Sequence, residues 1–482
     1  MKMMKAIGIA VVIGAGLMFG CTAPSKPDLG RLYATDSAVG MQPPVIVIPG
    51  ILGSRLREQD SGREVWPGSP RQLLFGDYRR LALRIDPTTL EPIDDGIEAY
   101  DIFDQLLGSD YYGNLLKTLA TYGHFTRTQP GTVVRDRRRR YYVFAYDWRQ
   151  DNVLTARKLD ALIEQIRVDH GDADLRVDIV AHSMGGLITR YYLRYGAADV
   201  LDDNDLPITY AGVQKVRTTI LLGTPNLGSI SALHRFIAGE RIGLSRLDPE
   251  ILATIPSAYQ LFPHPLLDWL VTPEGRVLDR DLFDTRIWQA FEWSVYDPAM
   301  RDRLRKRFAT HEEAEEYLVT LQAYFGRRLE RARRFVWALT RQLETSPERI
   351  VVFGGNCMNT PARLLVEEID GKSVIRLSPG DVRTAAANAP YRRLRSEPGD
   401  GLVTKPSLLG RARLDPSQAR HPYAFFPLAY AMFLCESHQR LTGNPSFQDN
   451  LLNVLLSQER PFDQESGPAF HRRAGTTSRV QP

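Results

Sequence analysis

The chain is poor in cysteine, nearly balanced in charge and free of repeats and low-complexity segments. Only three of its 482 residues are cysteine. It has neither a Cys-x-x-Cys pair nor a cluster of histidine and cysteine, so we expect no metal and no dissociable cofactor. A formal net charge of +4 gives no reason to expect a nucleic-acid partner. With 43% hydrophobic and 24% charged residues, the composition is that of a globular protein and excludes wholesale disorder.

The first 20 residues have the pattern of an export signal. Their apolar stretch follows a lysine-containing start and is shorter than the roughly 20 residues that a transmembrane helix needs. Leu17–Cys21 resembles a bacterial lipobox, so we expect Cys21 to be lipidated and residues 21–42 to form a tether. Thr22 replaces the aspartate associated with inner-membrane retention, which favours the outer membrane. Plain secretion and an uncleaved anchor are the alternatives.

The other two cysteines are far apart in the sequence. Cys357 and Cys435 are separated by 435 − 357 = 78 positions. In an oxidising compartment they can form a disulfide, which the chain-entropy account credits with about 4.5 kcal/mol. Two buried thiols are an equally favoured alternative.

Apolar strands alternate with helical segments, which predicts an α/β fold with a mainly parallel sheet. The predicted strands are residues 45–50, 141–149, 176–183, 216–225 and 349–356. The helices with clear apolar spacing are residues 152–171, 186–196 and 447–458. Asp370 and Gly371 lie at the turn of a predicted hairpin over 363–377.

Residues 231–348 interrupt this alternation. Their pattern is mostly helical, with an apolar stripe that includes Leu318, Phe325 and Leu329. An insertion between late strands of a parallel sheet typically forms a cap beside the strand ends, where ligands bind. A purely structural appendage is the alternative. The predicted organisation is a core of residues 43–230 and 349–460, a helical cap over 231–348 and a disordered tail over 461–482.

One short motif indicates the chemistry. Ala181-His182-Ser183-Met184-Gly185 follows an apolar strand and precedes a helix, as in the G-x-S-x-G nucleophile elbow of α/β hydrolases. The elbow needs small residues two positions before and after the serine, and alanine is the smallest side chain after glycine. We therefore expect Ser183 to be a nucleophile. The alternative is a helix-capping serine, and His182 is expected to be structural.

A nucleophilic serine needs a histidine to accept its proton and an acid to hold the histidine. In this fold the chain order is serine, acid, histidine. Asp400, in GDGLV, is the predicted acid and Asp381 its alternative. His438, in SHQRL, is the predicted base and His421 its alternative.

The tetrahedral oxyanion also needs backbone donors. One is expected from Met184, directly after the nucleophile. The other is expected from Leu52, in the loop PGILGS, where Gly50 and Gly53 allow the backbone to approach a substrate.

Several motifs together resemble the lecithin:cholesterol acyltransferase family. They are, in order, PVIVIPGILGSRL, EVWPG, AYDWR, AHSMGG, LGTPNLGS, PSAYQLFP, GDGLV and SHQRL, over residues 43–455. The resemblance implies an α/β-hydrolase fold with an inserted cap, a Ser183–Asp400–His438 triad, and oxyanion donors at Leu52 and Met184. It also implies cleavage of a lipid acyl ester through an acyl-enzyme, whose acyl group passes to an alcohol or to water.

The resemblance extends to Trp66, which matches a loop residue near the region where lipid enters and is expected to bind substrate. A packed surface tryptophan before Pro67 is the alternative. The chain departs from the family in having Ala181 at the elbow and no cysteine pair beside the VWPG loop, which leaves sterol preference open.

The leading hypothesis is therefore a lipid acyl hydrolase or O-acyltransferase that acts on phospholipid-like esters at a membrane surface. A triacylglycerol lipase or general carboxylesterase is the first alternative. A catalytically inactive lipid-binding or scaffold protein is the second. Neither the acceptor nor the oligomeric state can be inferred from the sequence.

Overall fold

The structure is a computed structural model that describes much of the chain outside its two ends. The described residues are 26–35, 42–106, 108–202, 206–341, 346–370, 372–376, 382, 391–411 and 426–457. The predicted signal peptide, Cys21, the alternatives Asp381 and His421, and the predicted tail lie outside these residues. Within the described part, no helix combines the length and the apolar character needed to cross a bilayer.

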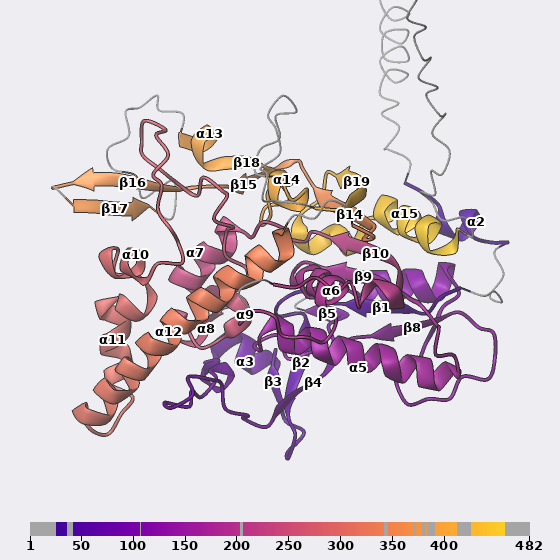
Figure 1. Ribbon diagram of the computed structural model, residues 1–482, viewed down its shortest axis with the longest axis horizontal. Helices are drawn as coiled ribbons and strands as arrows, with labels where there is room; N and C mark the ends of the chain where they lie inside the picture. Colours follow the sequence, from indigo (N-terminus) through magenta and orange to yellow (C-terminus); the bar gives the residue numbers. More distant parts are fainter. Residues whose placement is uncertain are drawn as a thin grey trace, which may run out of the picture.

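A parallel sheet occupies the centre of the molecule (Figure 1). In the described part it has seven strands in the order β19-β14-β10-β9-β1-β8-β7, and every neighbouring pair is parallel. The strands are β1 (Val45–Ile48), β7 (Thr126–Arg127), β8 (Arg140–Val143), β9 (Val177–His182), β10 (Val216–Leu222), β14 (Ile350–Gly355) and β19 (Leu428–Leu434). The predicted α/β class is confirmed.

Helices cover both faces of this sheet, as the uninterrupted apolar run of β1 requires. Ile46 and Ile48 share a core with α5 (Asn152–His170) and α6 (Met184–Tyr195). Val45 and Val47, which point to the other face, share a core with α4 (Gly113–Lys117) and α15 (Pro445–Leu456). The alternating side chains of one strand therefore join two separate apolar layers.

One predicted strand is too long. The expected strand over 141–149 corresponds to β8, which ends at Val143. Beyond it, the Tyr146 amide donates to the Ser54 hydroxyl at 3.1 Å, and Arg149 pairs with Asp95 at 2.7 Å. These polar contacts draw the chain away from the sheet, which the apolar pattern alone does not reveal.

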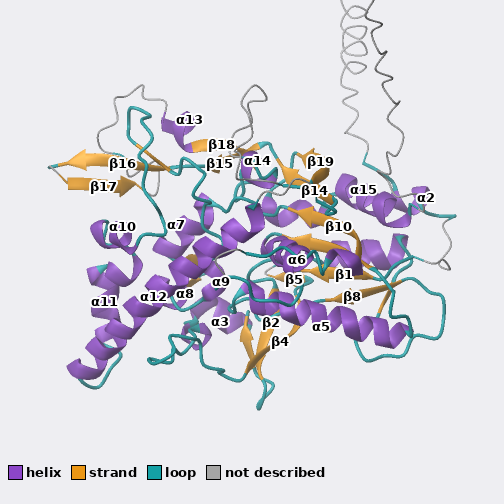
Figure 2. Ribbon diagram, in the orientation of Figure 1, coloured by secondary structure: helices purple, strands orange, loops and turns teal. Residues whose placement is uncertain are grey.

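The insertion lies beside the sheet and is mainly helical (Figure 2). Its helices are α7 (Ile230–Ala238), α8 (Pro249–Leu252), α9 (Pro256–Tyr259), α10 (Thr285–Ala290), α11 (Pro298–Arg305) and α12 (His311–Thr340). Its strands are β11 (Glu240–Ile242), β12 (Ser245–Leu247) and β13 (Leu270–Val271). α12 begins with a capping box formed by Thr310 and Glu313, and its apolar stripe packs on α6 and α9.

Smaller elements surround these two parts. They are α2 (Leu29–Leu32), α3 (Pro70–Phe75), α13 (Tyr391–Arg395), α14 (Lys405–Leu408), β2 (Ser54–Glu58), β3 (Glu64–Trp66), β4 (Ile97–Ile102), β5 (Gln105–Leu106), β6 (Ser109–Asp110), β15 (Met358–Pro361), β16 (Leu364–Ile369), β17 (Lys372–Arg376) and β18 (Ser396–Gly399). The predicted hairpin is confirmed, because β16 and β17 are antiparallel neighbours. The antiparallel sheet β3-β2-β4 was not predicted.

The structure also answers the question left open for two cysteines. Cys357 and Cys435 form a disulfide with their Cα atoms 5.0 Å apart. Cys357 follows β14 and Cys435 follows β19, so the bond joins the carboxyl ends of two neighbouring strands.

Candidate active site

Ser183 lies on a sharp turn between β9 and α6. Its backbone has φ 53° and ψ −123°, a strained conformation for a residue with a side chain. Two and three residues after Ser183 the chain needs glycine, since a Cβ on Gly185 would lie 2.5 Å from the Pro49 carbonyl oxygen, and one on Gly186 2.0 Å from Thr224 Oγ1. The Ser183 amide donates to the Leu222 carbonyl at 2.8 Å, which ties the turn to the neighbouring strand.

The structure brings Ser183, His438 and Asp400 together from three distant segments. His438 Nε2 lies 3.0 Å from Ser183 Oγ, and His438 Nδ1 lies 2.8 Å from Asp400 Oδ2. The other carboxylate oxygen of Asp400 accepts from the amides of Leu402 and Val403 at 3.0 and 2.7 Å. Because the Asp400 carboxylate accepts a hydrogen bond from Nδ1–H, the unprotonated Nε2 faces the serine hydroxyl. This arrangement can move a proton from Ser183 to His438.

The predicted oxyanion residues flank Ser183. Leu52 has a positive φ of 63°, within a turn closed by a 3.1 Å hydrogen bond from the Gly53 amide to the Gly50 carbonyl. Met184 is the first residue of α6, where backbone N–H groups favour negative charge. Met184 is thus adjacent to Ser183 in the chain, and Leu52 lines the same pocket; their role as oxyanion donors stays a prediction.

Trp66 occupies a different place from either sequence expectation. It is only 1% exposed and packs against Tyr78, Phe103 and Trp148, with ring centroids 5.3, 6.4 and 5.4 Å away. It does not line the pocket at Ser183, so neither a substrate contact nor a surface tryptophan describes it. Its indole N–H donates to the Leu52 carbonyl at 2.9 Å, so it helps to hold the turn that contains Leu52.

A hydrogen-bond chain behind the site was not predicted. The Gly50 amide donates to the Tyr112 hydroxyl at 2.9 Å, and that hydroxyl lies 2.9 Å from His182 Nδ1. His182 Nε2 in turn lies 3.3 Å from the His438 carbonyl oxygen. Since the Tyr112 hydroxyl accepts from Gly50, its proton goes to Nδ1, and Nε2 donates to the carbonyl. We call this chain, from Gly50 through Tyr112 and His182 to His438, the Gly50–His438 relay.

Burial keeps both side chains of the relay uncharged. Desolvation, together with a smaller contribution from the nearby His438, lowers the pKa of His182 to about 3. Burial also raises the pKa of Tyr112 well above its usual value. His182 is structural, as expected, but Tyr112 gave no sequence signal because its partner is 70 positions away.

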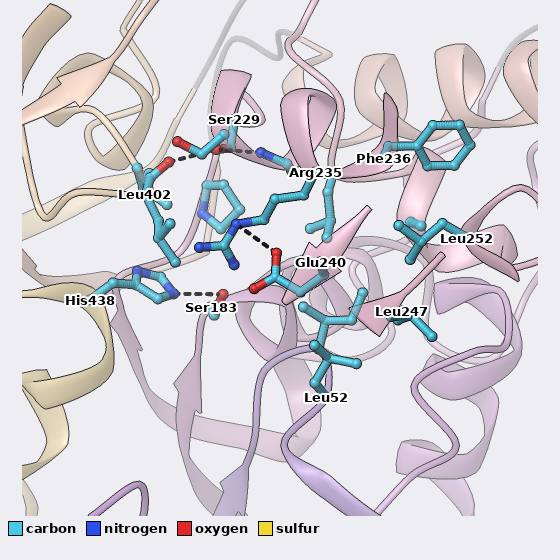
Figure 3. Close-up of a pocket in the computed structure, with 17 residues that line it drawn as sticks. Leu52, Ser183, Ser229, Arg235, Phe236, Glu240, Leu247, Leu252, Leu402 and His438 are labelled. Atoms are coloured by element: carbon cyan, nitrogen blue, oxygen red, sulfur yellow. Dashed lines mark hydrogen bonds and ion pairs between the residues drawn. The ribbon is translucent and has the colours of Figure 1, made fainter. Parts of the chain in front are cut away.

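A pocket opens in front of Ser183 and His438 (Figure 3). Its volume is about 700 Å³ when the part open to solvent is counted. The residues that line it, besides Ser183 and His438, are Ile51, Leu52, Pro225, Ser229, Ser231, Ala232, Arg235, Phe236, Glu240, Leu247, Leu252, Ala258, Leu261, Leu402 and Val403. Most are apolar, which suits an acyl chain. In the described part of the chain, no group of three His, Cys, Asp or Glu side chains is arranged to hold a metal.

The parallel sheet and the strand–turn–helix at Ser183 are those of the α/β-hydrolase fold. Residues 90–310 match the family model of lecithin:cholesterol acyltransferase. This match confirms the family resemblance inferred from the motifs. It spans Ser183 and most of the insertion, and it supports an enzyme that hydrolyses or transfers the acyl group of a lipid ester.

A comparison with solved structures finds similarity at low sequence identity. The crystal structure of the Tle4–Tli4 complex has 14% identity and a TM-score of 0.50, over 86% of this chain and 98% of that chain. The mature lipase BlEst2 from Bacillus licheniformis has 12% identity and a TM-score of 0.31, over 88% and 95%. EstA from Clostridium botulinum has 13% identity and a TM-score of 0.34, over 90% and 91%. No curated protein matches the chain by sequence.

Proposed function

We propose that the protein is a serine-dependent lipid acyl hydrolase or O-acyltransferase that cleaves an acyl ester of phospholipid-like substrates. The observation that carries this proposal is the Ser183–His438–Asp400 geometry, with distances of 3.0 and 2.8 Å, at the mouth of an apolar pocket. The family match over residues 90–310 supports a lipid substrate.

The reaction begins when His438 Nε2 accepts the Ser183 proton and the serine oxygen attacks the ester carbonyl carbon. The Leu52 and Met184 amides donate to the resulting oxyanion, and Asp400 stabilises the imidazolium. When the tetrahedral intermediate collapses, the ester C–O bond breaks and His438 returns the proton to the leaving alcohol. The acyl group then remains on Ser183.

The second half repeats these steps with a new nucleophile. His438 deprotonates a water molecule or an alcohol, which attacks the acyl-serine carbonyl. Collapse releases the fatty acid or the new ester and returns the proton to Ser183. Whether water or an alcohol serves as acceptor depends on how far the lipid and the pocket walls exclude water.

We also propose that the protein is exported and anchored to the outer membrane through a lipidated Cys21. The N-terminal pattern is the main support. The disulfide between Cys357 and Cys435 adds to it, because such bonds persist in oxidising compartments. An anchor would hold the pocket near its insoluble substrate.

The test compares the wild-type protein with Ser183→Ala and with Ser61→Ala, an exposed serine in a turn. Each protein is incubated with mixed phospholipid vesicles, with and without an added long-chain alcohol, and the products are identified by mass spectrometry. We expect Ser183→Ala to lose at least about 10³-fold in rate and Ser61→Ala to match the wild type.

The products separate the alternatives. Free fatty acid alone indicates a hydrolase, and a new ester with the alcohol indicates a transferase. Turnover of triacylglycerol or a soluble ester without any turnover of phospholipid would favour the lipase or carboxylesterase alternative. Full ester cleavage by Ser183→Ala would refute the proposal.

A further inference from the structure

Two charged side chains lie in the otherwise apolar pocket. Arg235, in α7, and Glu240, in β11, form an ion pair with Nε and Oε2 3.0 Å apart. Their side chains are 37% and 18% exposed, and both line the pocket together with Ser183. Figure 3 shows Arg235 reaching down from α7 toward the Ser183–His438 pair, with Glu240 beside it.

The stability of the fold does not explain why this ion pair lies in the pocket. Partly exposed ion pairs contribute little to stability, and apolar side chains would complete an acyl pocket better. Burial raises the pKa of Glu240, and only Arg235 opposes this effect. Keeping the Glu240 carboxylate in the pocket costs desolvation free energy. This indicates that its charge serves to bind a ligand.

A third polar group lies on the same helix face. Ser231 precedes Arg235 by four residues, so both point to one side of α7. Ser231 lines the pocket, and its buried hydroxyl has no hydrogen-bond partner among the described residues. Burying a hydroxyl without a hydrogen-bond partner costs free energy. This indicates that the Ser231 hydroxyl donates to an oxygen of a bound ligand.

We propose that Arg235 and Ser231 bind the phosphodiester group, and Glu240 the amine, of a zwitterionic phospholipid whose acyl ester lies at Ser183. This inference rests on the proposed function. The guanidinium offers paired N–H donors that match phosphate oxygens. Bound in this way, the lipid places its phosphate beside the Arg235 guanidinium and its ammonium beside the Glu240 carboxylate, so that each of the four charges lies next to charges of the opposite sign.

The arrangement predicts an order among headgroups. Phosphatidylethanolamine supplies both the phosphate and the amine. Phosphatidylglycerol supplies the phosphate but leaves Glu240 without a cation. Diacylglycerol supplies neither charge, so it gains nothing from Arg235 and serves as the internal reference for the ester chemistry.

The experiment measures initial rates on dioleoyl phosphatidylethanolamine, dioleoyl phosphatidylglycerol and dioleoylglycerol in neutral detergent micelles, at equal mole fraction. The variants are Arg235→Gln and Glu240→Gln. Their controls, Arg241→Gln and Glu274→Gln, make the same charge changes at exposed residues outside the pocket. A fluorophosphonate probe counts the serine sites that react.

For Arg235→Gln, we expect the rate on phosphatidylethanolamine relative to dioleoylglycerol to fall about 10- to 100-fold, since a charge-assisted bond is lost. Arg235→Lys should recover part of this ratio. For Glu240→Gln, we expect the ratio of phosphatidylethanolamine to phosphatidylglycerol to fall at least about fivefold. The two controls should keep the wild-type ratios.

The outcomes distinguish this inference from the proposed function. If Arg235→Gln reacts with the probe and keeps the ratios of Arg241→Gln, the headgroup subsite is wrong while the serine hydrolase stands. If the wild type neither reacts with the probe nor cleaves any ester, the proposed function itself fails. Ratios that change as much in each control as in the pocket variant with the same charge change would also overturn the subsite, since they would reflect net charge alone.

Discussion

The two walls of the pocket are built differently. On the core side, Ser183, His438 and Leu52 follow strands of the central part of the fold and are held by backbone strain, short hydrogen bonds and a disulfide between strand ends. On the insertion side, α7 and the β11–β12 hairpin contribute apolar side chains and one ion pair. We expect the core wall to determine where a bond is broken, and the insertion wall to determine which molecule is held there.

The two walls should differ in how well they tolerate substitutions. The Ser183 turn is held by its hydrogen bond to Leu222, and the glycines after it pass so close to Pro49 and Thr224 that no side chain fits there. α7 and the hairpin pack on the rest of the protein through side chains such as Phe236, but their pocket-facing side chains shape the space that a ligand would occupy. We therefore expect variants of the core wall to affect kcat and stability, and variants of the insertion wall to affect substrate choice.

The largest effect should come from protonating His182, behind the core wall, which lowers the free energy of unfolding. The pKa of His182 is lowered from 6.5 to about 3 by burial. His182 is neutral in both states above pH 6.5, so its contribution to stability is fully present there. As pH falls below 6.5, the unfolded chain takes up the proton first and stability is lost toward pH 3. Between pH 7 and pH 4 this loss is about 3 kcal/mol.

Urea unfolding at pH 7 and pH 4 measures this difference. His182→Gln should lose less free energy of unfolding over this range than the wild type, because it has no imidazole to protonate. His311→Gln, at an exposed position, serves as control and should follow the wild-type curve. Equal losses in wild type and His182→Gln would show that the buried imidazole does not limit acid stability.

An intermediate effect should come from the Gly50–His438 relay. Tyr112→Phe removes the hydroxyl that accepts from the Gly50 amide and donates to His182. The oxyanion turn and His438 then lose their common support, and a buried amide loses its partner. We expect kcat to fall about 10- to 100-fold with KM little changed.

Steady-state kinetics on a soluble ester measures this effect. The half-buried Tyr122 lies outside the relay, so Tyr122→Phe should keep the wild-type kcat. A rise in KM with an unchanged kcat for Tyr112→Phe would place the relay in substrate binding and break the proposed division between the walls.

The smallest effect should come from the insertion wall. Leu247, in β12, lines the pocket, and Leu247→Val removes one methylene. A methylene contact is worth about 0.8 kcal/mol, so we expect the preference between C8 and C16 acyl esters to change roughly fourfold. Competition between the two esters in one reaction measures the ratio. A loss of kcat on both esters, with the ratio unchanged, would instead give this residue a role in the chemistry.

The local sequence predicted what depends on local constraints. The apolar run of β1, the helix α5 and the elbow at Ser183 each follow from spacing and side-chain size within about 20 neighbouring residues. The motifs around Asp400 and His438 suggested the partners of Ser183, and the structure places both beside it. Trp66 could not be placed, because its burial depends on Tyr78, Phe103 and Trp148 from separate segments.

By itself, the sequence determined the α/β class, the turn that strains Ser183 and the chain order of serine, acid and histidine, since strand, turn and helix preferences act between near neighbours. Only the tertiary structure decided that Cys357 meets Cys435, that Tyr112 joins Gly50 to His182, and that the pocket places Arg235 and Glu240 in front of Ser183. These contacts depend on how the chain packs as a whole, because the local sequence of one segment does not reveal which distant residues it will contact.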